Sequence, residues 1–270
     1  MAEAVTTRKC LFCDSPANSR EHVIPQWLSK RMNRRDYKFR AGRYSEQTGA
    51  FALPETTALT FKTRQVCNDC NNGWMSQLET WFQRHLGFLV EPDWPLLGED
   101  MVYALREEPE PLMRWMIKTA IVFDRALPNR QIGAIPEALH AMAKDRVIGD
   151  DFHLLVGYIM EPALGVFLSK GFPVWNGGSL YQNQHHVDGF GFSICLNHLA
   201  IRLVRAPDAN IGIKAHGRSV PDGAALVPYF VNRKMRYETP VKFSFPNFEL
   251  FLDAVELYTG SSRNQSLILH

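Results

Sequence analysis

Hydrophobic and polar positions along this chain follow two periods, one typical of helices and one typical of strands. Apolar residues recur every three or four positions over residues 72–89 and 111–127, which predicts two long amphipathic helices. Shorter helices are predicted at 26–32, opened by Pro25, at about 137–146 and at 247–258. Strands are predicted at 21–24, 37–44, 51–66, 152–160, 164–170, 189–196, 199–204 and 226–230. The pattern therefore predicts an α+β protein with an antiparallel sheet.

A cluster of prolines and acids near residues 91–100 predicts a boundary in the 270-residue chain. We expect one domain over residues 1–90 and an α+β domain over residues 91–270. The first region carries thirteen Lys or Arg against eight Asp or Glu, and the second carries seventeen against twenty. The basic excess therefore lies in the first region. For residues 91–270 we expect a role in specificity, regulation or oligomerisation, through a second copy of the chain or a partner protein.

Four of the five cysteines form two C-x-x-C pairs, Cys10 with Cys13 and Cys67 with Cys70. Two such pairs are typical of a tetrahedral zinc site with four thiolate ligands. No signal peptide and no run of eighteen apolar residues is visible, so we expect a cytoplasmic protein with no membrane contact. In that reducing compartment, metal binding is favoured over disulfides. The fifth cysteine, Cys195, lies in an apolar run and is expected to be a small buried residue.

Between the two cysteine pairs lies an acid-histidine segment, Arg20 to Pro25, with Glu21 next to His22. An imidazole has an unperturbed pKa of about 6.5 and can act as a general base near neutral pH. Standing alone, such a pair is most often an incidental surface feature. Its position inside a frame of two cysteine pairs favours a catalytic role.

A basic stretch follows the acid-histidine segment, with seven Lys or Arg and one acid over residues 30–43 and aromatic residues interleaved. Cations neutralise phosphates and rings stack on bases, so this composition is typical of a nucleic-acid surface. The other interpretation is a solvated helix face followed by a hairpin strand. The candidate nucleic-acid contacts are Arg20, Lys30, Arg31, Arg34, Arg35, Lys38 and Arg40.

These motifs resemble those of the HNH endonucleases, in particular the branch with four cysteines. The likeness rests on Cys10-x-x-Cys13, on Glu21-His22-Val23-Ile24-Pro25 and on Cys67-x-x-Cys70-Asn71, and it covers about residues 8–90. It implies a treble-clef ββα-metal fold in which a structural zinc holds a hairpin against the first turn of a helix. It also implies DNA hydrolysis, with His22 as general base and with Glu21 and Asn71 holding Mg²⁺ or a similar divalent ion.

A second interpretation is a zinc-stabilised nucleic-acid-binding or adaptor protein without catalysis. The family usually carries an asparagine shortly before the second cysteine pair to orient the histidine, but residues 59–66 contain none. Gln65 or Thr63 would have to replace it. Asn72 remains an alternative to Asn71 as the ligand, or it caps the helix. An active nuclease is expected to bring Glu21, His22 and Asn71 around one cavity separate from the zinc.

Overall fold

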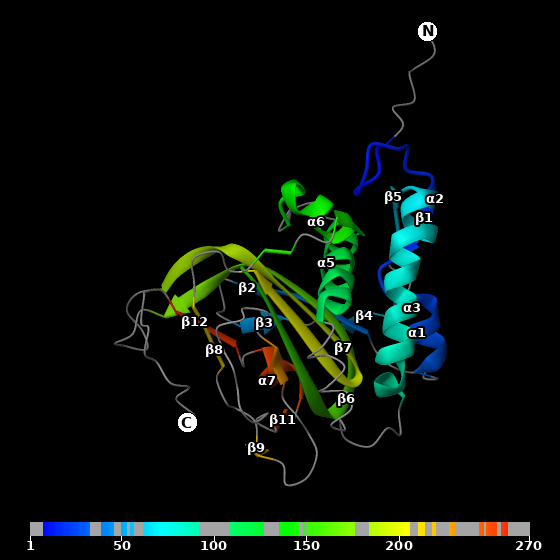
Figure 1. Cartoon of the computed structure of the whole chain (residues 1–270). Coiled ribbons are helices and arrows are strands. Elements are labelled where there is room, and N and C mark those ends of the chain that lie inside the picture. The colour runs from blue at the N-terminus through cyan, green and yellow to red at the C-terminus, as the bar shows by residue number, and fades with distance from the viewer. Residues whose placement is uncertain are drawn as a thin grey trace.

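The computed structural model combines helices with a large sheet, which confirms the α+β class (Figure 1). Within the part of the chain that the structure describes, no helix is long and apolar enough to cross a membrane. The described residues are 8–32, 39–45, 50–52, 55–56, 62–91, 109–126, 135–145, 148–149, 151–175, 184–205, 210–213, 218–219, 227–229, 243–245, 247–252 and 255–258.

The N-terminal region is built on two short antiparallel strands, β1 (Ser19–His22) and β5 (Lys62–Val66). Helical structure follows β5 as predicted, and its bounds are α2 (Asn68–Cys70), a π-helical turn (Asn71–Met75), α3 (Ser76–His85) and a 3-10 turn (Gly87–Val90). The helix predicted at 26–32 is confirmed as α1 (Gln26–Arg31), with Pro25 immediately before it. Leu78 and Phe82 lie on the buried side of α3, as its apolar period predicts.

Helix α5 (Pro109–Ala126) joins the N-terminal region to the sheet. It contacts α3 and β5 on one side and the two longest strands on the other (Figure 1). All of its residues from 112 to 124 are buried, because neighbours cover it on more than one side. A 3-10 turn (Glu137–Leu139) and α6 (His140–Asp145) then pack against α5, close to the helix predicted at 137–146.

The sheet is organised around an antiparallel pair of long strands, β6 (Phe152–Trp175) and β7 (Gln184–Arg205). The sequence predicts four separate strands here, and that prediction is wrong, because each pair of segments is one strand interrupted by bulges. The larger bulge lies between Tyr158 and Ala163, opposite Asn197. Asn197 has a φ of 64° and is fully buried, which is a left-handed conformation that Asn tolerates better than most residues.

Shorter strands extend this sheet, which contains ten strands among the described residues. They are β2 (Phe39–Ser45), β3 (Ala50–Ala52), β4 (Glu55–Thr56), β8 (Asn210–Ile213), β9 (Arg218–Ser219), β10 (Val227–Tyr229), β11 (Phe243–Phe245) and β12 (Val255–Tyr258). The predicted helix at 247–258 is only half right. Helix α7 ends early (Phe248–Leu252), because Val255–Tyr258 pairs with β8 and β6 instead.

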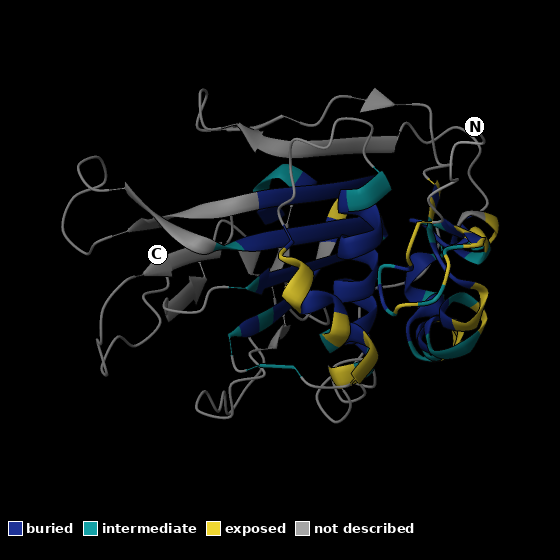
Figure 2. Cartoon of the chain, turned by 90° about the horizontal axis from the view of Figure 1, so that it is seen from above, coloured by how far each residue is buried: buried dark blue, intermediate teal, exposed yellow. Residues whose placement is uncertain are grey.

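The larger of two hydrophobic clusters among the described residues runs through both predicted domains. It includes Phe82 of α3, Trp115 of α5 and Phe192 of β7, and buried residues fill the central strands and the helix packed on them (Figure 2). Strand β2 from the first region also pairs in parallel with β6 of the second. The division at residue 90 stays a prediction, but the two regions share their core and part of their sheet.

Candidate functional site

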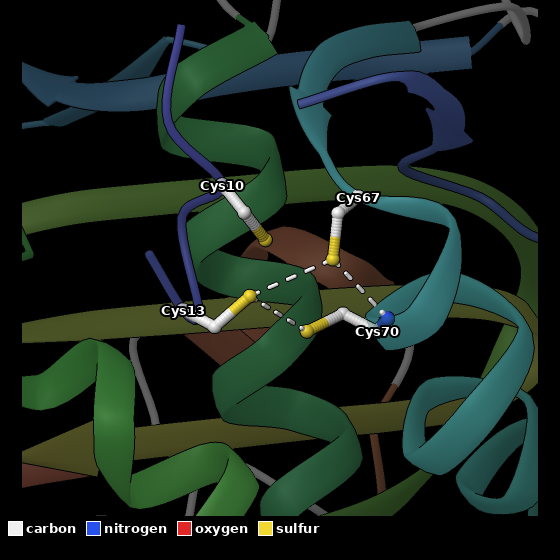
Figure 3. Close-up of side chains that lie close together, drawn as sticks. All are labelled: Cys10, Cys13, Cys67 and Cys70. Carbon is white, nitrogen blue, oxygen red and sulfur yellow. Dashed lines mark hydrogen bonds between the residues drawn. The ribbon is translucent and has the colours of Figure 1, made fainter. Parts of the chain in front are cut away.

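The four paired cysteines converge beside α2, with Cys67 just before this short helix and Cys70 as its last residue (Figure 3). Their sulfur atoms all lie within 4.8 Å of one another, and Cys13 Sγ is 3.6 Å from Cys67 Sγ and 3.7 Å from Cys70 Sγ. The four residues therefore lie close enough to bind one metal ion. A closed set of four thiol donors fits Zn²⁺, which favours tetrahedral thiolate coordination in structural sites.

Local hydrogen bonds hold the first cysteine loop against the strand and the helix. The backbone N–H of Leu11 donates to the Gln65 carbonyl at 2.8 Å, and that of Asn68 donates to Asn18 Oδ1 at 2.8 Å. Cys67 caps α2 by accepting a bond from the Cys70 N–H. The Phe12 ring packs edge-on against Trp74 with 5.2 Å between ring centroids. These contacts bring the two cysteine pairs together across more than fifty residues of chain.

The surroundings of Cys10, Cys13 and Cys70 shift the pKa of these thiols in different directions. Burial raises the pKa of Cys10 and of Cys70. Burial also acts to raise the pKa of Cys13, but hydrogen bonds with Ser15, Cys67 and Cys70 together outweigh it and lower the pKa to about 7. A bound metal ion stabilises the thiolate form of all its ligands, so metal binding at this cluster would release protons.

Glu21 points into the protein from β1. Its side chain is buried and its Oε1 accepts a hydrogen bond from Lys118 Nζ of α5 at 3.0 Å. The same ammonium donates to Glu79 Oε1 of α3 at 2.9 Å. Burial raises the pKa of Glu21, while Lys118 opposes this effect. The carboxylate expected to hold a catalytic ion is thus paired with a buried lysine.

His22 follows Glu21 on the strand and faces the other way, because successive side chains of a strand alternate. It is partly exposed and lies 3.0 Å, Nε2 to Nε2, from Gln26 at the start of α1. An amide NH₂ only donates, so in this arrangement His22 Nε2 accepts and the ring proton sits on Nδ1. Partial burial lowers the pKa of His22, and the charge of Lys62 lowers it further. Both effects favour the neutral form of the imidazole.

The orienting contact of His22 comes from a residue that the sequence analysis did not consider. Gln26 fills that place, whereas Gln65 Nε2 donates to the Arg125 carbonyl at 3.4 Å. Thr63 is buried, and its hydroxyl has no hydrogen-bond partner among the described residues. Neither of the two expected substitutes is seen to contact His22.

Asn71 lies at the end of α2, and its Nδ2 donates to Ser19 Oγ of β1 at 2.6 Å. This bond ties the helix to the strand that carries Glu21 and His22. A hydrated Mg²⁺ needs open oxygen ligands, but Lys118 engages the Glu21 carboxylate. As arranged, the Glu21 oxygen that Lys118 engages is not open to such an ion, and the assignment of Mg²⁺ to Glu21 and Asn71 stays a prediction.

Exposed cations share the outer face of the two-stranded sheet with His22. Lys62 pairs in register with His22, and Arg20 and Arg64 stand two residues along their strands. All three are exposed, whereas Glu21 and Thr63, which pair with each other, are buried. We name Arg20, His22, Lys62 and Arg64 the hairpin face.

The structure describes three of the other six candidate nucleic-acid contacts. Lys30 is exposed on α1. Arg31 is partly buried and pairs with Glu91, Nε to Oε1, at 2.8 Å. The backbone of Arg40 lies in β2, where it pairs with Gly165. Arg34, Arg35 and Lys38 lie outside the described residues.

Besides Gln26, the sequence analysis missed Lys62, Arg64 and Lys118 as residues of the site. A signal for the first two existed, because Lys62-x-Arg64 alternates polar and buried positions just before the second cysteine pair. A signal for Lys118 also existed, since it is the one charged residue within the largely apolar stretch 115–123 and a fully buried lysine needs a charged partner. The identity of that partner could not be read from the sequence.

Comparison of the chain with protein-family models, with curated proteins and with solved structures finds no match. The function must therefore be argued from the residues themselves.

Proposed function

We propose that this protein is an HNH-type endonuclease that hydrolyses DNA phosphodiester bonds, with His22 as the general base. The observation that carries the proposal is the hairpin face, where a partly exposed imidazole stands among Arg20, Lys62 and Arg64. In the proposed fold, β1 ends at His22, β5 pairs with β1, and the four cysteines fasten the helix that follows β5.

The charges of the hairpin face suit a phosphate backbone. Lysine and arginine side chains neutralise phosphates and orient them, which is the sequence-independent part of nucleic-acid binding. A phosphate bound next to Lys62 would lie beside His22, because these two residues pair across the strands. The same lysine lowers the pKa of His22 and so keeps the ring able to accept a proton from water.

In this proposal the zinc is structural and takes no part in the reaction. It holds the loop of Cys13 against the helix that starts after Cys67, and so fixes the distance between that helix and β1. The charge that stabilises the attacked phosphate comes from Arg20, Lys62 and Arg64. Gln26 orients the imidazole and must move aside before Nε2 can take a proton.

The experiment that tests the proposal is cleavage of supercoiled plasmid and of single-stranded DNA, without added metal and with Mg²⁺ or Mn²⁺. The wild type is compared with His22→Ala and with His85→Ala, a histidine of α3 that stacks on Trp81 instead. Elemental analysis first establishes that all three proteins hold zinc. Cleavage by the wild type and by His85→Ala, but not by His22→Ala, is the expected result. Equal cleavage by His22→Ala would refute the assignment.

A second function is favoured by one contact, the pairing of Glu21 with Lys118. A carboxylate used in this way supports a zinc-stabilised nucleic-acid-binding module that does not cleave. Such a module would bind DNA in a salt-sensitive way through the same hairpin face and leave the plasmid intact under every metal condition.

A further inference from the structure

Two carboxylates from separate elements converge on one ammonium in the interior. Glu21 Oε1 of β1 lies 3.0 Å and Glu79 Oε1 of α3 lies 2.9 Å from Lys118 Nζ of α5. The Lys118 side chain is 0% exposed, and that of Glu21 is 7% exposed. A buried charge is tolerated only when it is paired and hydrogen-bonded, and here one cation satisfies two anions.

The ammonium of Lys118 lies between two carboxylates, where a bound cation would otherwise balance their charge. Burial acts to lower the pKa of Lys118, but Glu79 and Glu21 outweigh it and raise the pKa above its ordinary value. The lysine therefore stays charged at neutral pH. Two carboxylates facing one positive charge is also the arrangement with which proteins bind hard divalent ions.

We propose that Lys118 is the resident cation of this site, with its ammonium held between Glu21 and Glu79 in the place of a divalent metal ion. The three residues come from a strand, the helix after the zinc cluster and the helix that joins the sheet. The site is thus filled by the chain itself and links these three elements without a bound ion.

Uptake of a divalent ion at Glu21 distinguishes this arrangement from a metal-binding site. The wild-type protein takes up no divalent ion at Glu21, because an ion there would have to displace a buried ammonium from both carboxylates. Removal of the lysine side chain leaves two carboxylates and a vacated volume between them, and so creates a divalent-ion site where the wild type has none.

The test is Mn²⁺ binding to the zinc-loaded full-length protein, measured by electron paramagnetic resonance and calorimetry without DNA. The wild type is compared with Glu21→Gln, with Lys118→Ala and with the double variant that carries both changes. We expect no Glu21-dependent binding by the wild type, about one equivalent of Mn²⁺ bound by Lys118→Ala, and loss of that binding in the double variant. Elemental analysis establishes that zinc stays in place throughout.

Two results would overturn the proposal. One is Mn²⁺ binding by the wild type that disappears in Glu21→Gln, because Glu21 would then be a metal ligand. The other is a folded Lys118→Ala protein that takes up no ion. If Lys118→Ala does not fold, the wild type and Glu21→Gln still decide, since Glu21→Gln keeps the pair of Lys118 with Glu79. The readout is ion binding, so it stays separate from the outcome of the cleavage experiment.

Discussion

The Lys118 ammonium lies 3.0 Å from the Glu21 carboxylate, and both side chains are buried. Replacing Lys118 by Met keeps much of the side-chain volume but leaves Glu21 and Glu79 without their cation. Breaking a buried pair in this way costs about 3–5 kcal/mol. We expect a loss of that size in the free energy of unfolding, measured by denaturant titration of the zinc-loaded protein.

The matched control for Lys118→Met is Lys144→Met, because Lys144 is exposed on α6. An exposed lysine is expected to change stability by less than about 0.5 kcal/mol. Glu21→Gln combined with Lys118→Met should recover part of the loss, since it removes one of the two stranded carboxylates. Equal stabilities for the Lys118 and Lys144 variants would show that the buried pairing is not formed in solution.

The proton affinity of His22 is expected to depend on Lys62. The positive charge of Lys62 lowers the pKa of His22 in addition to the effect of burial. Lys62→Gln should therefore raise that pKa, and the acidic limb of any activity that uses His22 as a base should move to higher pH. Titration of the His22 ring followed by NMR measures the pKa directly. Arg64→Gln, two residues along the same strand, is the control and should cause a smaller shift.

Zinc content is expected to follow the four clustered cysteines and to ignore the fifth. Cys70→Ala removes one of the four clustered thiols, whereas Cys195→Ala changes a buried thiol in β7 that donates to the Asn197 carbonyl. Elemental analysis should find zinc reduced in Cys70→Ala and retained in Cys195→Ala. Zinc binding should also release protons, seen as a buffer-dependent enthalpy in calorimetry. Full zinc occupancy in Cys70→Ala would contradict a site made of four thiolates.

Binding to DNA is expected to weaken with salt through the hairpin face. Neutralising one phosphate contact lowers the slope of log affinity against log salt by about one. We expect Arg20→Gln, Lys62→Gln and Arg64→Gln each to lower the slope by about that amount, measured by fluorescence anisotropy over a series of salt concentrations. Lys144→Gln should leave the slope unchanged. A slope unaltered in all three hairpin variants would move the proposed interface elsewhere.

The sequence predicted those parts of the site that depend on local spacing. Two C-x-x-C pairs were enough to predict the cysteine cluster, because each pair places two sulfur atoms on one short loop or helical turn. The helices after Cys70 and around Trp115 follow from a period of three to four residues, which an apolar helix face requires. The α+β class follows from the same local patterns.

Local patterns did not predict what long-range packing determines. Glu21 and His22 are neighbours in the sequence, and only their alternation on β1 sends one towards Lys118 and the other to the hairpin face. Lys118 lies 97 residues from Glu21, and Gln26 rather than Gln65 contacts His22. Val255–Tyr258 became a strand because β8 and β6 offered hydrogen-bond partners that its own sequence does not specify.

The sequence alone therefore determined which residues have metal-binding or acid-base chemistry, since that depends on residue type and short spacing. Only the tertiary structure decided which of them meet. It buried Glu21 against a lysine, left His22 among exposed cations and built one core from both halves of the chain. The physical reason is that burial and charge pairing depend on elements far apart in the sequence, and those are brought together only when the sheet and α5 have packed.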